Sequence, residues 1–190
     1  MYNYKICIAG KNQCSIDFVS FLIRKKLRNN IIVLPNASDK GVDNWQPSLK
    51  KFSKKNKIKI VRKSELYRIK NLILFSIEYE KILKVSKFKS DKLFNVHFSL
   101  LPKYRGCNTN YLQVKYGEKT TGVTLHKIDK GIDTGEIIDQ IKFNLNINDT
   151  AIENYKKLMK YSVKIFQKNF FKIIKKKYNL KKQKDKFSSY

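Results

Sequence analysis

The sequence predicts an α/β domain built on a mostly parallel, twisted sheet with flanking helices. Short runs of β-branched and aromatic residues alternate along the chain with segments whose apolar residues recur at helical spacing. Strands separated by helices are typical of parallel sheets, because a parallel pair needs a long crossover connection. A length of 190 residues suits one domain of ordinary size. We therefore expect a Rossmann-like domain that opens toward ligands after its first strand.

The first half of the chain predicts four strands and two helices. The strands are short apolar runs bounded by glycine, proline or polar residues, over 4–9, 31–34, 57–61 and 71–76. One helix covers 15–28, where the apolar spacing is helical. A second helix covers 47–55 and has Pro47 near its first turn.

The second half is more mixed and ends in a long helix. Strands are predicted at 93–97, 121–128 and 137–147, and a short helix at 107–116. A capping-box pattern, Thr150-Ala-Ile-Glu153, starts the long helix. Its apolar face consists of Ile152, Tyr155, Leu158, Met159, Val163, Phe166, Phe170 and Ile173.

The end of the sequence differs in composition from the rest. Residues 179–190 are polar and rich in Lys, and we expect them to form a mobile tail. The folded domain is accordingly predicted over 1–178, without an internal repeat or a linker.

The charge of the chain allows two interpretations. Forty-two basic and fifteen acidic residues give a net charge of +27, which is typical of proteins that bind nucleic acid. Only five of the basic residues are Arg, the preferred residue for bidentate phosphate recognition, and the Lys residues are scattered over every segment. A compositional bias toward Lys, Asn and Ile explains the excess equally well. We expect no specific nucleic-acid partner, and anionic small substrates stay compatible.

Other features exclude further classes. No apolar run approaches the roughly 20 residues that span a bilayer, and the first ten residues are too short an apolar stretch for a signal peptide. Cys7, Cys14 and Cys107 form neither a CxxC pair nor an even disulfide framework. The expectation is a cytoplasmic protein without a membrane span or a bound metal.

Three polar residues of the second half can act together chemically. Asn95 and His97 lie two apart near a predicted strand end, so their side chains share one face. An amide donor beside an imidazole can stabilise an oxyanion and move a proton. Asp133 lies between Gly131 and Gly135, in a backbone that can approach a ligand closely. From the residues alone, the more common interpretations are a structural His and a turn Asp. A second histidine, His126, alternates with apolar neighbours, and we predict a structural role for it.

The surroundings of these residues resemble a known family. The segment Asn95-Val-His-Phe-Ser-Leu-Leu-Pro102, followed by Gly131-Ile-Asp-Thr-Gly135, is similar to the 10-formyltetrahydrofolate-dependent formyltransferases. Their pattern is Asn-x-His-x-Ser-Leu-Leu-Pro and then Asp-x-Gly. The resemblance implies the formyltransferase fold and attack of a substrate amine on the formyl carbon of N10-formyltetrahydrofolate. It implies that Asn95 donates to the oxyanion, that His97 transfers protons, and that Asp133 orients His97 and relays the proton to the leaving N10.

The same resemblance implies where the folate binds. In this family the pterin contacts mainly backbone groups of two loops. The matching positions are Ser76, Ile77, Glu78 and Tyr79 in the first loop and Ile128 and Asp129 in the second. For Tyr79 and Ile128, a place in the core is the alternative.

The acceptor must be inferred separately. About forty residues follow the last predicted strand, too few for the RNA-binding barrel of the transfer-RNA enzymes, and Gly10-Lys-Asn-Gln13 does not reproduce the phosphate loop of the purine enzymes. The segments 35–49 and 97–107 resemble nucleotide-sugar N-formyltransferases. This resemblance implies a dTDP-linked 3- or 4-amino-dideoxy sugar for surface glycans such as lipopolysaccharide or O-antigen. The expected substrate-binding residues are Lys11, Asn12, Trp45 and Tyr104.

Several alternatives stay open. Trp45 either anchors the core or offers a face to a base or sugar. The acceptor could be methionyl-tRNA or glycinamide ribonucleotide, the enzyme a formyltetrahydrofolate hydrolase, or the chain a basic RNA-associated protein with weak catalysis. The resemblance also implies that the family's C-terminal segment, which often carries dimer contacts, continues past Tyr190. A homodimer is therefore among the expectations.

Overall fold

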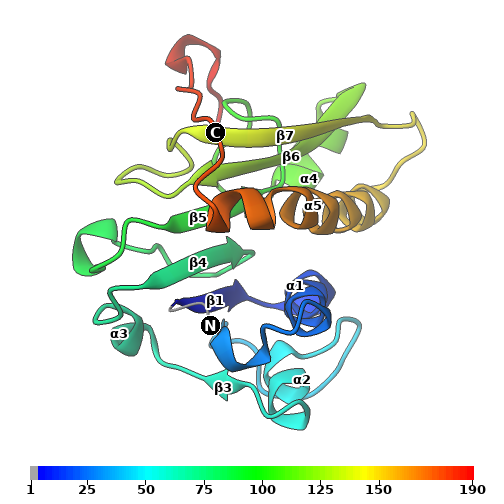
Figure 1. Ribbon diagram of the computed structural model, residues 1–190. Helices are drawn as coiled ribbons and strands as arrows, with labels where there is room; N and C mark the ends of the chain where they lie inside the picture. Colours follow the sequence, from blue (N-terminus) through cyan, green and yellow to red (C-terminus); the bar gives the residue numbers. More distant parts are fainter. Residues whose placement is uncertain (1–3) are drawn as a thin grey trace. The chain divides into compact units, whose positions relative to one another are not determined.

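The structure, a computed structural model, describes residues 4–190 (Figure 1). These residues form two compact units, which divide between Phe94 and Asn95. Both units combine β-strands with helices, and strand β5 (Leu93–His97) contains the division.

The first unit contains a parallel sheet with the strand order β3-β2-β1-β4. Its strands are β1 (Lys5–Gly10), β2 (Ile31–Pro35), β3 (Lys59–Ile60) and β4 (Leu72–Ile77). Ile8 of β1 aligns with Val33 of β2 and with Phe75 of β4. All three side chains are fully buried, as expected for a parallel sheet that is covered on both faces. The carboxyl ends of β1, β2 and β4 therefore lie at one edge.

The described part of this unit, residues 4–94, contains the α-helices α1 (Asn12–Arg24), α2 (Leu49–Lys55) and α3 (Lys63–Leu66). Helix α1 packs against β1 and α2. The α2 helix starts at Ser48, whose hydroxyl oxygen accepts a hydrogen bond from the Lys51 amide at 2.9 Å. The predicted strand over 57–61 is only two residues long in the structure, because β3 pairs with β2 at just two positions. Helix α1 also begins three residues before the predicted 15–28 segment.

The second unit is built around strands β6 (Thr120–Lys127) and β7 (Ile137–Asn144), which pair antiparallel. The register shifts between Leu125 and His126, where β7 carries an extra residue opposite β6. Such a bulge bends the strand and re-aims the side chains beside it. Helix α4 (Thr109–Lys115) precedes β6.

Helix α5 (Ala151–Ile174) packs against α4, β6 and β7 (Figure 1). The predicted capping box is present: the Thr150 amide donates to the Glu153 carboxylate at 2.7 Å, and the Glu153 amide donates to the Thr150 hydroxyl at 3.3 Å. One expectation about its apolar face was wrong, because Ile152 is 44% exposed. Ile165, which the pattern did not include, is fully buried. The buried residues of α5 begin at Asn154, so Ile152 lies before the buried face.

Residues 179–190, predicted as a mobile tail, make hydrogen bonds within the second unit. Lys181 forms an antiparallel bridge with Ile137 through two backbone hydrogen bonds of 2.8 and 2.9 Å. The single turn Asp185–Phe187 follows. The mobility of this segment and the domain limit at residue 178 stay predictions.

Residues 4–190 confirm the predicted class, with seven strands in a mostly parallel α/β sheet and flanking helices. Within residues 4–190, no helix has both the length and the apolar character needed to cross a membrane.

Candidate active site

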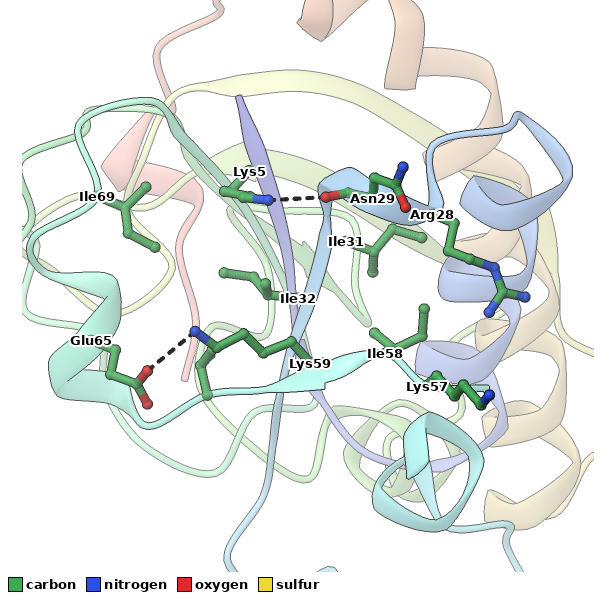
Figure 2. A pocket seen from close by; sticks show the side chains of 11 residues that line it. Lys5, Arg28, Asn29, Ile31, Ile32, Lys57, Ile58, Lys59, Glu65 and Ile69 are labelled. Atoms are coloured by element: carbon green, nitrogen blue, oxygen red, sulfur yellow. Dashed lines mark hydrogen bonds and ion pairs between the residues drawn. The ribbon is translucent and has the colours of Figure 1, made fainter. Parts of the chain in front are cut away.

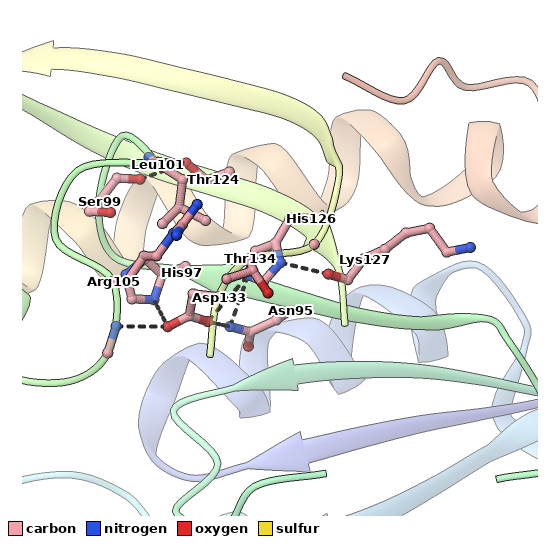
Figure 3. A network of polar contacts seen from close by, with 12 residues as sticks. Asn95, His97, Ser99, Leu101, Arg105, Thr124, His126, Lys127, Asp133 and Thr134 are labelled. Atoms are coloured by element: carbon pink, nitrogen blue, oxygen red, sulfur yellow. Dashed lines mark hydrogen bonds and ion pairs between the residues drawn. The ribbon is translucent and has the colours of Figure 1, made fainter. Parts of the chain in front are cut away.

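The carboxylate of Asp133 lies at the centre of a cluster in the second unit (Figure 3). One oxygen, Oδ1, accepts a hydrogen bond from Asn95 Nδ2 at 3.1 Å. The other, Oδ2, accepts from the Gly106 amide at 2.9 Å and lies 3.4 Å from His97 Nδ1. The three predicted catalytic residues are thus brought together by the structure.

Electrostatics favour a charged Asp133. Burial alone would raise the pKa of its carboxyl, but the two histidines and the Gly106 amide outweigh burial and hold the pKa well below its usual value. Only 14% of the side chain is exposed. The cluster therefore surrounds a fixed negative charge that water screens little.

The conformation of the loop around Asp133 explains why a glycine is needed at position 135. Asp133 itself has the left-handed conformation, with φ of 52°. Asp adopts this conformation more readily than most residues with a side chain. Gly135 is needed for close packing, because a Cβ there would lie 1.8 Å from the Lys127 carbonyl oxygen. The loop thus combines one strained residue with one position that has no room for a side chain.

His97 is buried between two acceptors. Its Nε2 lies 2.6 Å from the Tyr104 carbonyl oxygen, and a carbonyl can only accept, so Nε2 carries the hydrogen. Nδ1 then faces Asp133. Burial lowers the pKa of the His97 imidazole below its usual value, although Asp133 and the Tyr104 carbonyl act in the opposite direction. The ring is accordingly neutral near pH 7, and a proton added at Nδ1 would form an ion pair with Asp133.

The Asn95 amide has both hydrogens engaged. Nδ2 lies 3.1 Å from Asp133 Oδ1 and 3.3 Å from His126 Nε2. The carboxylate fixes the orientation of the amide, since a flipped amide would set oxygen against oxygen. Asn95 can donate to an oxyanion only by exchanging one of these contacts, and the contact with His126 is the longer.

His126 is a site residue that the sequence reading placed in a structural role. Its Nδ1 donates to the Lys127 carbonyl at 2.7 Å, which leaves Nε2 as an acceptor for Asn95. Nε2 is also 3.4 Å from Asp133 Oδ1. The bulge between Leu125 and His126 aims this ring at the cluster. The signal available in the sequence was its place in the same strand–loop motif as Asp133.

The loop after β5 contributes two backbone groups. Tyr104 supplies the carbonyl that binds His97, and Gly106 supplies the amide that binds Asp133. The Tyr104 hydroxyl, in contrast, donates to Glu118 at 2.8 Å, and burial raises its pKa to about 12. The role of Tyr104 in substrate binding stays a prediction. Its carbonyl contacts His97, and a backbone contact of this kind cannot be predicted from the type of residue.

In the first unit, predicted residues gather at the carboxyl ends of β1 and β4. Lys11 precedes α1, and Asn12 has φ of 64°. Asn12 Nδ2 lies 3.5 Å from the carboxylate of Glu78, which is also left-handed with φ of 53°. Buried Asn36 joins these ends, because its Nδ2 donates to the Glu78 carbonyl at 2.9 Å.

The remaining predicted residues of this unit lie around the same edge. Trp45 is 69% exposed, so the interpretation of Trp45 as a core anchor was wrong. Its loop is held near α1, because the Gln13 amide donates to Gln46 Oε1 at 3.3 Å. Ser76 and Ile77 end β4 and are buried, whereas Tyr79 is half-buried.

The second predicted folate loop is closed by its own side chain. Asp129 Oδ1 accepts from the Gly131 amide at 3.1 Å and from the Thr134 hydroxyl at 2.6 Å. Ile128 is half-buried rather than a core residue, and Ile132 is 50% exposed. Residues 129–132 of this loop are thus exposed, and the Asp129 side chain shapes the loop. Among the described residues, no group of three or more His, Cys, Asp or Glu is arranged to hold a metal.

A separate cavity of about 550 Å³ lies in the first unit (Figure 2). Lys5, Ile31 and Lys59 line it at the amino ends of β1, β2 and β3. Two of the cations that line it have partners inside the protein: Lys5 donates to the Asn29 carbonyl at 2.9 Å, and Lys59 is 3.9 Å from Glu65. Ligands of open α/β sheets bind at the opposite, carboxyl ends. None of the predicted site residues lines this cavity.

Comparison with known proteins agrees with this geometry. Bifunctional polymyxin resistance protein ArnA of Wigglesworthia glossinidia brevipalpis is 42% identical over 154 residues, which are 75% of this chain and 24% of that protein. Methionyl-tRNA formyltransferase of Fervidobacterium nodosum is 31% identical over 175 residues, 86% of this chain and 56% of that protein. The chain therefore spans about a quarter and about half the length of these relatives.

Two solved structures superimpose on nearly the whole chain. One is the N-formyltransferase from Helicobacter canadensis in complex with folinic acid and dTDP-3-aminofucose, with a TM-score of 0.96 and 46% identity over 98% of this chain and 70% of that chain. The other is WlaRD, a sugar 3N-formyl transferase with dTDP and 5-N-formyl-THF, with a TM-score of 0.96 and 48% identity over 100% of this chain and 70% of that chain. The model of the formyl transferase family matches residues 23–169, well over half of the sequence. The chain belongs to the formyl transferase family.

Proposed function

We propose that the protein is a sugar N-formyltransferase, which moves the formyl group of N10-formyltetrahydrofolate to the amino group of a dTDP-linked 3- or 4-amino-dideoxy sugar. The observation that carries the proposal is the cluster of Asn95, His97 and Asp133 in a chain 46–48% identical to two sugar N-formyltransferases. The transfer-RNA relative is less similar, at 31% identity over 86% of the chain.

The groups of the cluster suit formyl transfer. N10-formyltetrahydrofolate supplies the formyl carbon and a nitrogen leaving group. A neutral imidazole and an ionised carboxylate, 3.4 Å apart, can take the proton that the attacking amine must lose. Because Asp133 is already ionised, it stabilises the charge that His97 gains with the proton.

Asn95 has the second task, stabilisation of the oxyanion. We infer that its amide releases His126 and keeps Asp133 when the oxyanion forms, because the contact with Asp133 is shorter and involves a charge. His126 would then hold the Asn95 amide before the reaction. A preorganised donor of this kind contributes on the order of 10²–10³ to kcat.

The residues for ligand binding form the finer part of the proposal. We propose that backbone groups of Ser76, Ile77, Glu78, Tyr79, Ile128 and Asp129 bind the pterin, and that Lys11, Asn12, Trp45 and Tyr104 contact the nucleotide sugar. The exposed face of Trp45 supports stacking on a base or sugar. Residues 129–132 of the loop closed by Asp129 are exposed, which supports recognition of the pterin by this loop.

The proposal extends to the setting of the reaction. The thiols of Cys7 and Cys14 are buried and not joined in a disulfide, which supports a reducing compartment such as the cytoplasm. A product carrying a formamido sugar would serve synthesis of surface glycans such as lipopolysaccharide or O-antigen. We further propose a homodimer that uses neither a metal nor a specific nucleic-acid partner.

A panel assay tests this function. The protein is incubated with the folate donor and with dTDP-, UDP- and GDP-linked amino sugars in turn, and products are identified by mass spectrometry. The expected result is a dTDP-amino sugar heavier by one CO unit. No such product with any acceptor in the panel would contradict the proposal. Formylation of methionyl-tRNA, or retention on RNA at physiological salt, would support the alternatives instead.

A further inference from the structure

The C-terminal strap, defined here as residues 181–190, contacts both loops that carry the catalytic contacts. Gln183 of the strap binds the loop of Asp133. Gln183 also binds Arg105, and Ser189 binds Tyr104, both in the loop that runs from Tyr104 to Gly106. We propose that Gln183 and Arg105 are positioning residues, through which the strap holds Asp133 and the Tyr104 carbonyl in place around His97. This inference rests on the proposed formyl transfer.

Gln183 makes a bridge that few side chains could make. Its Nε2 donates to the carbonyl oxygens of Asp133 and Gly135, both at 2.8 Å. Its Oε1 accepts from Arg105, from Nη2 at 2.9 Å and from Nε at 3.3 Å. A Glu could not donate to the two carbonyls, and an Ala could do neither. The neutral amide therefore fits both sides of the bridge.

Arg105 lies between the two residues whose backbone contacts the catalytic cluster. Tyr104, before it, accepts from His97, and Gly106, after it, donates to Asp133. The Arg105 side chain is only 4% exposed, and it is held by Gln183 and by Asp185 at 2.7 Å. A buried guanidinium needs such partners, because an unpaired buried charge is costly.

Further hydrogen bonds with Ser189 of the strap hold the backbone of Tyr104 and Arg105. The Arg105 amide donates to the Ser189 carbonyl at 2.7 Å, and the Tyr104 amide donates to the Ser189 hydroxyl at 2.8 Å. Tyr104, like Asp133, has a left-handed backbone, with φ of 56°. Both strained residues are thus held by the strap, which explains how two unfavourable conformations persist beside each other.

The consequence concerns distances at the reacting centre. His97 has two partners, and each partner belongs to a loop that the strap holds. Loss of Gln183 would let the two loops move apart, and a misplacement of about 1 Å can cost on the order of 10²-fold in rate. Substrate affinity should change less, because the bridge touches the catalytic loops from within the protein.

The test compares Gln183→Ala with the control Lys184→Ala, whose side chain is exposed beside it. We expect Gln183→Ala to lower kcat by about 10–100-fold and to change KM for the folate donor by less than about threefold. Lys184→Ala should keep the kcat of the unchanged protein. Asp185→Ala, which removes an 82% exposed partner of Arg105, should fold normally and lower kcat in the same direction by a smaller factor.

A second readout does not depend on the acceptor. Asp133 and the Tyr104 carbonyl both raise the pKa of His97, so loosening them should lower that pKa in Gln183→Ala and Asp185→Ala but not in Lys184→Ala. Titration of the His97 ring by NMR measures this pKa, and the ionisable side chains that face the ring are Asp133 and His126. The pKa readout holds even if no sugar is formylated, so failure of the function and failure of the strap are distinguishable. Unchanged kcat and unchanged His97 pKa in folded Gln183→Ala would overturn the proposal, as would unchanged values in Asp185→Ala if Gln183→Ala did not fold.

Discussion

At the scale of single residues, the Asp133 carboxylate depends on donors that replace water. Oδ1 accepts from Asn95, and Oδ2 accepts from the Gly106 amide. Each oxygen also faces a histidine, His126 or His97, at 3.4 Å. A buried charge is stable only when it is paired or hydrogen-bonded, and this carboxylate accepts hydrogen bonds from two N–H donors. The same arrangement makes the site sensitive to the loss of one oxygen.

Asp133→Asn tests that sensitivity. Its amide has one acceptor and one donor end, so the NH₂ group would meet the donor of either Asn95 or Gly106. Asn tolerates the left-handed backbone, so the variant should fold. We expect kcat to fall by about 10²–10⁴-fold, the range for positioned acid–base groups, with only a modest change in folate affinity. The same phenotype is expected for His97→Asn.

The matched control is Asp139→Asn on β7, another carboxylate with a lowered pKa, bound to Lys168 at 2.8 Å and to Asn169 at 2.7 Å. It should keep kcat. Steady-state kinetics on the confirmed acceptor and the far-ultraviolet circular dichroism of each variant provide the comparison. Turnover equal to that of the unchanged protein would reduce Asp133 to a turn residue.

The pH dependence follows from His97. Burial lowers its pKa, so the ring loses its proton below the ordinary value of about 6.5 and is neutral at pH 7. Activity should fall as the pH drops through this lowered pKa, because a protonated ring accepts no proton. The charge of Asp133 raises the pKa, so Asp133→Asn should move the NMR titration of His97 to lower pH. A titration that moved to higher pH, or a His97 pKa above 6.5, would contradict the assigned contacts.

The sequence identified Asn95, His97 and Asp133 because side chains two apart on a strand share a face and because their pattern resembles a family. It could not identify the Tyr104 carbonyl or the Gly106 amide, since backbone contacts depend on loop conformation rather than residue type. The role of Gln183 could not be predicted from the sequence either. It lies among Lys residues without periodicity, where composition predicts mobility.

At the scale of elements, the turn from β6 to β7 depends on Gly135. A Cβ there would lie 1.8 Å from the Lys127 carbonyl and 3.5 Å from His126 Nδ1, so the loop must shift. We expect Gly135→Ala to destabilise the fold by about 1–3 kcal/mol, the range for overpacking, and to lower kcat at least tenfold. Thermal unfolding and kinetics measure the two effects.

Gly117, at the end of α4, is the control. It has φ of 63° but nothing within 4 Å of an added Cβ. Gly117→Ala should therefore cost about 1 kcal/mol of backbone strain and leave kcat unchanged. If both variants lost activity equally, stability rather than the geometry around His126 would explain the loss.

Elements were predictable where burial imposes a pattern. Strand β5 matches its predicted range of 93–97, and β1, β2 and β4 match to within one residue at each end. Helix α3 has only four residues, too few for an apolar period, and was not predicted. The early start of α1 was not predicted, because Asn12 and Gln13 are polar and show no apolar pattern. Their place in the helix follows from where β1 ends.

At the scale of the whole molecule, the net charge of +27 invites a test of electrostatic steering. Lys181, Lys182, Lys184 and Lys186 have exposed side chains. Fully exposed charges interact weakly at physiological salt, where the Debye length is about 8 Å, so changing all four to Gln should alter kcat/KM by less than about twofold. The measurement is kcat/KM across a series of salt concentrations, together with retention on RNA. A large, salt-dependent loss would show that the strap lysines attract the anionic substrate.

In the proposed reaction, a formyl carbon moves from folate to a sugar amine at the Asn95–His97–Asp133 cluster. N10-formyltetrahydrofolate labelled with ¹³C in the formyl group allows that carbon to be followed by NMR in the presence of a dTDP-linked 3-amino-dideoxy sugar. We expect a labelled formamide on the sugar with the unchanged protein and almost none with Asp133→Asn. Label recovered as formate, on methionyl-tRNA, or only on the folate with every amino sugar offered would contradict it.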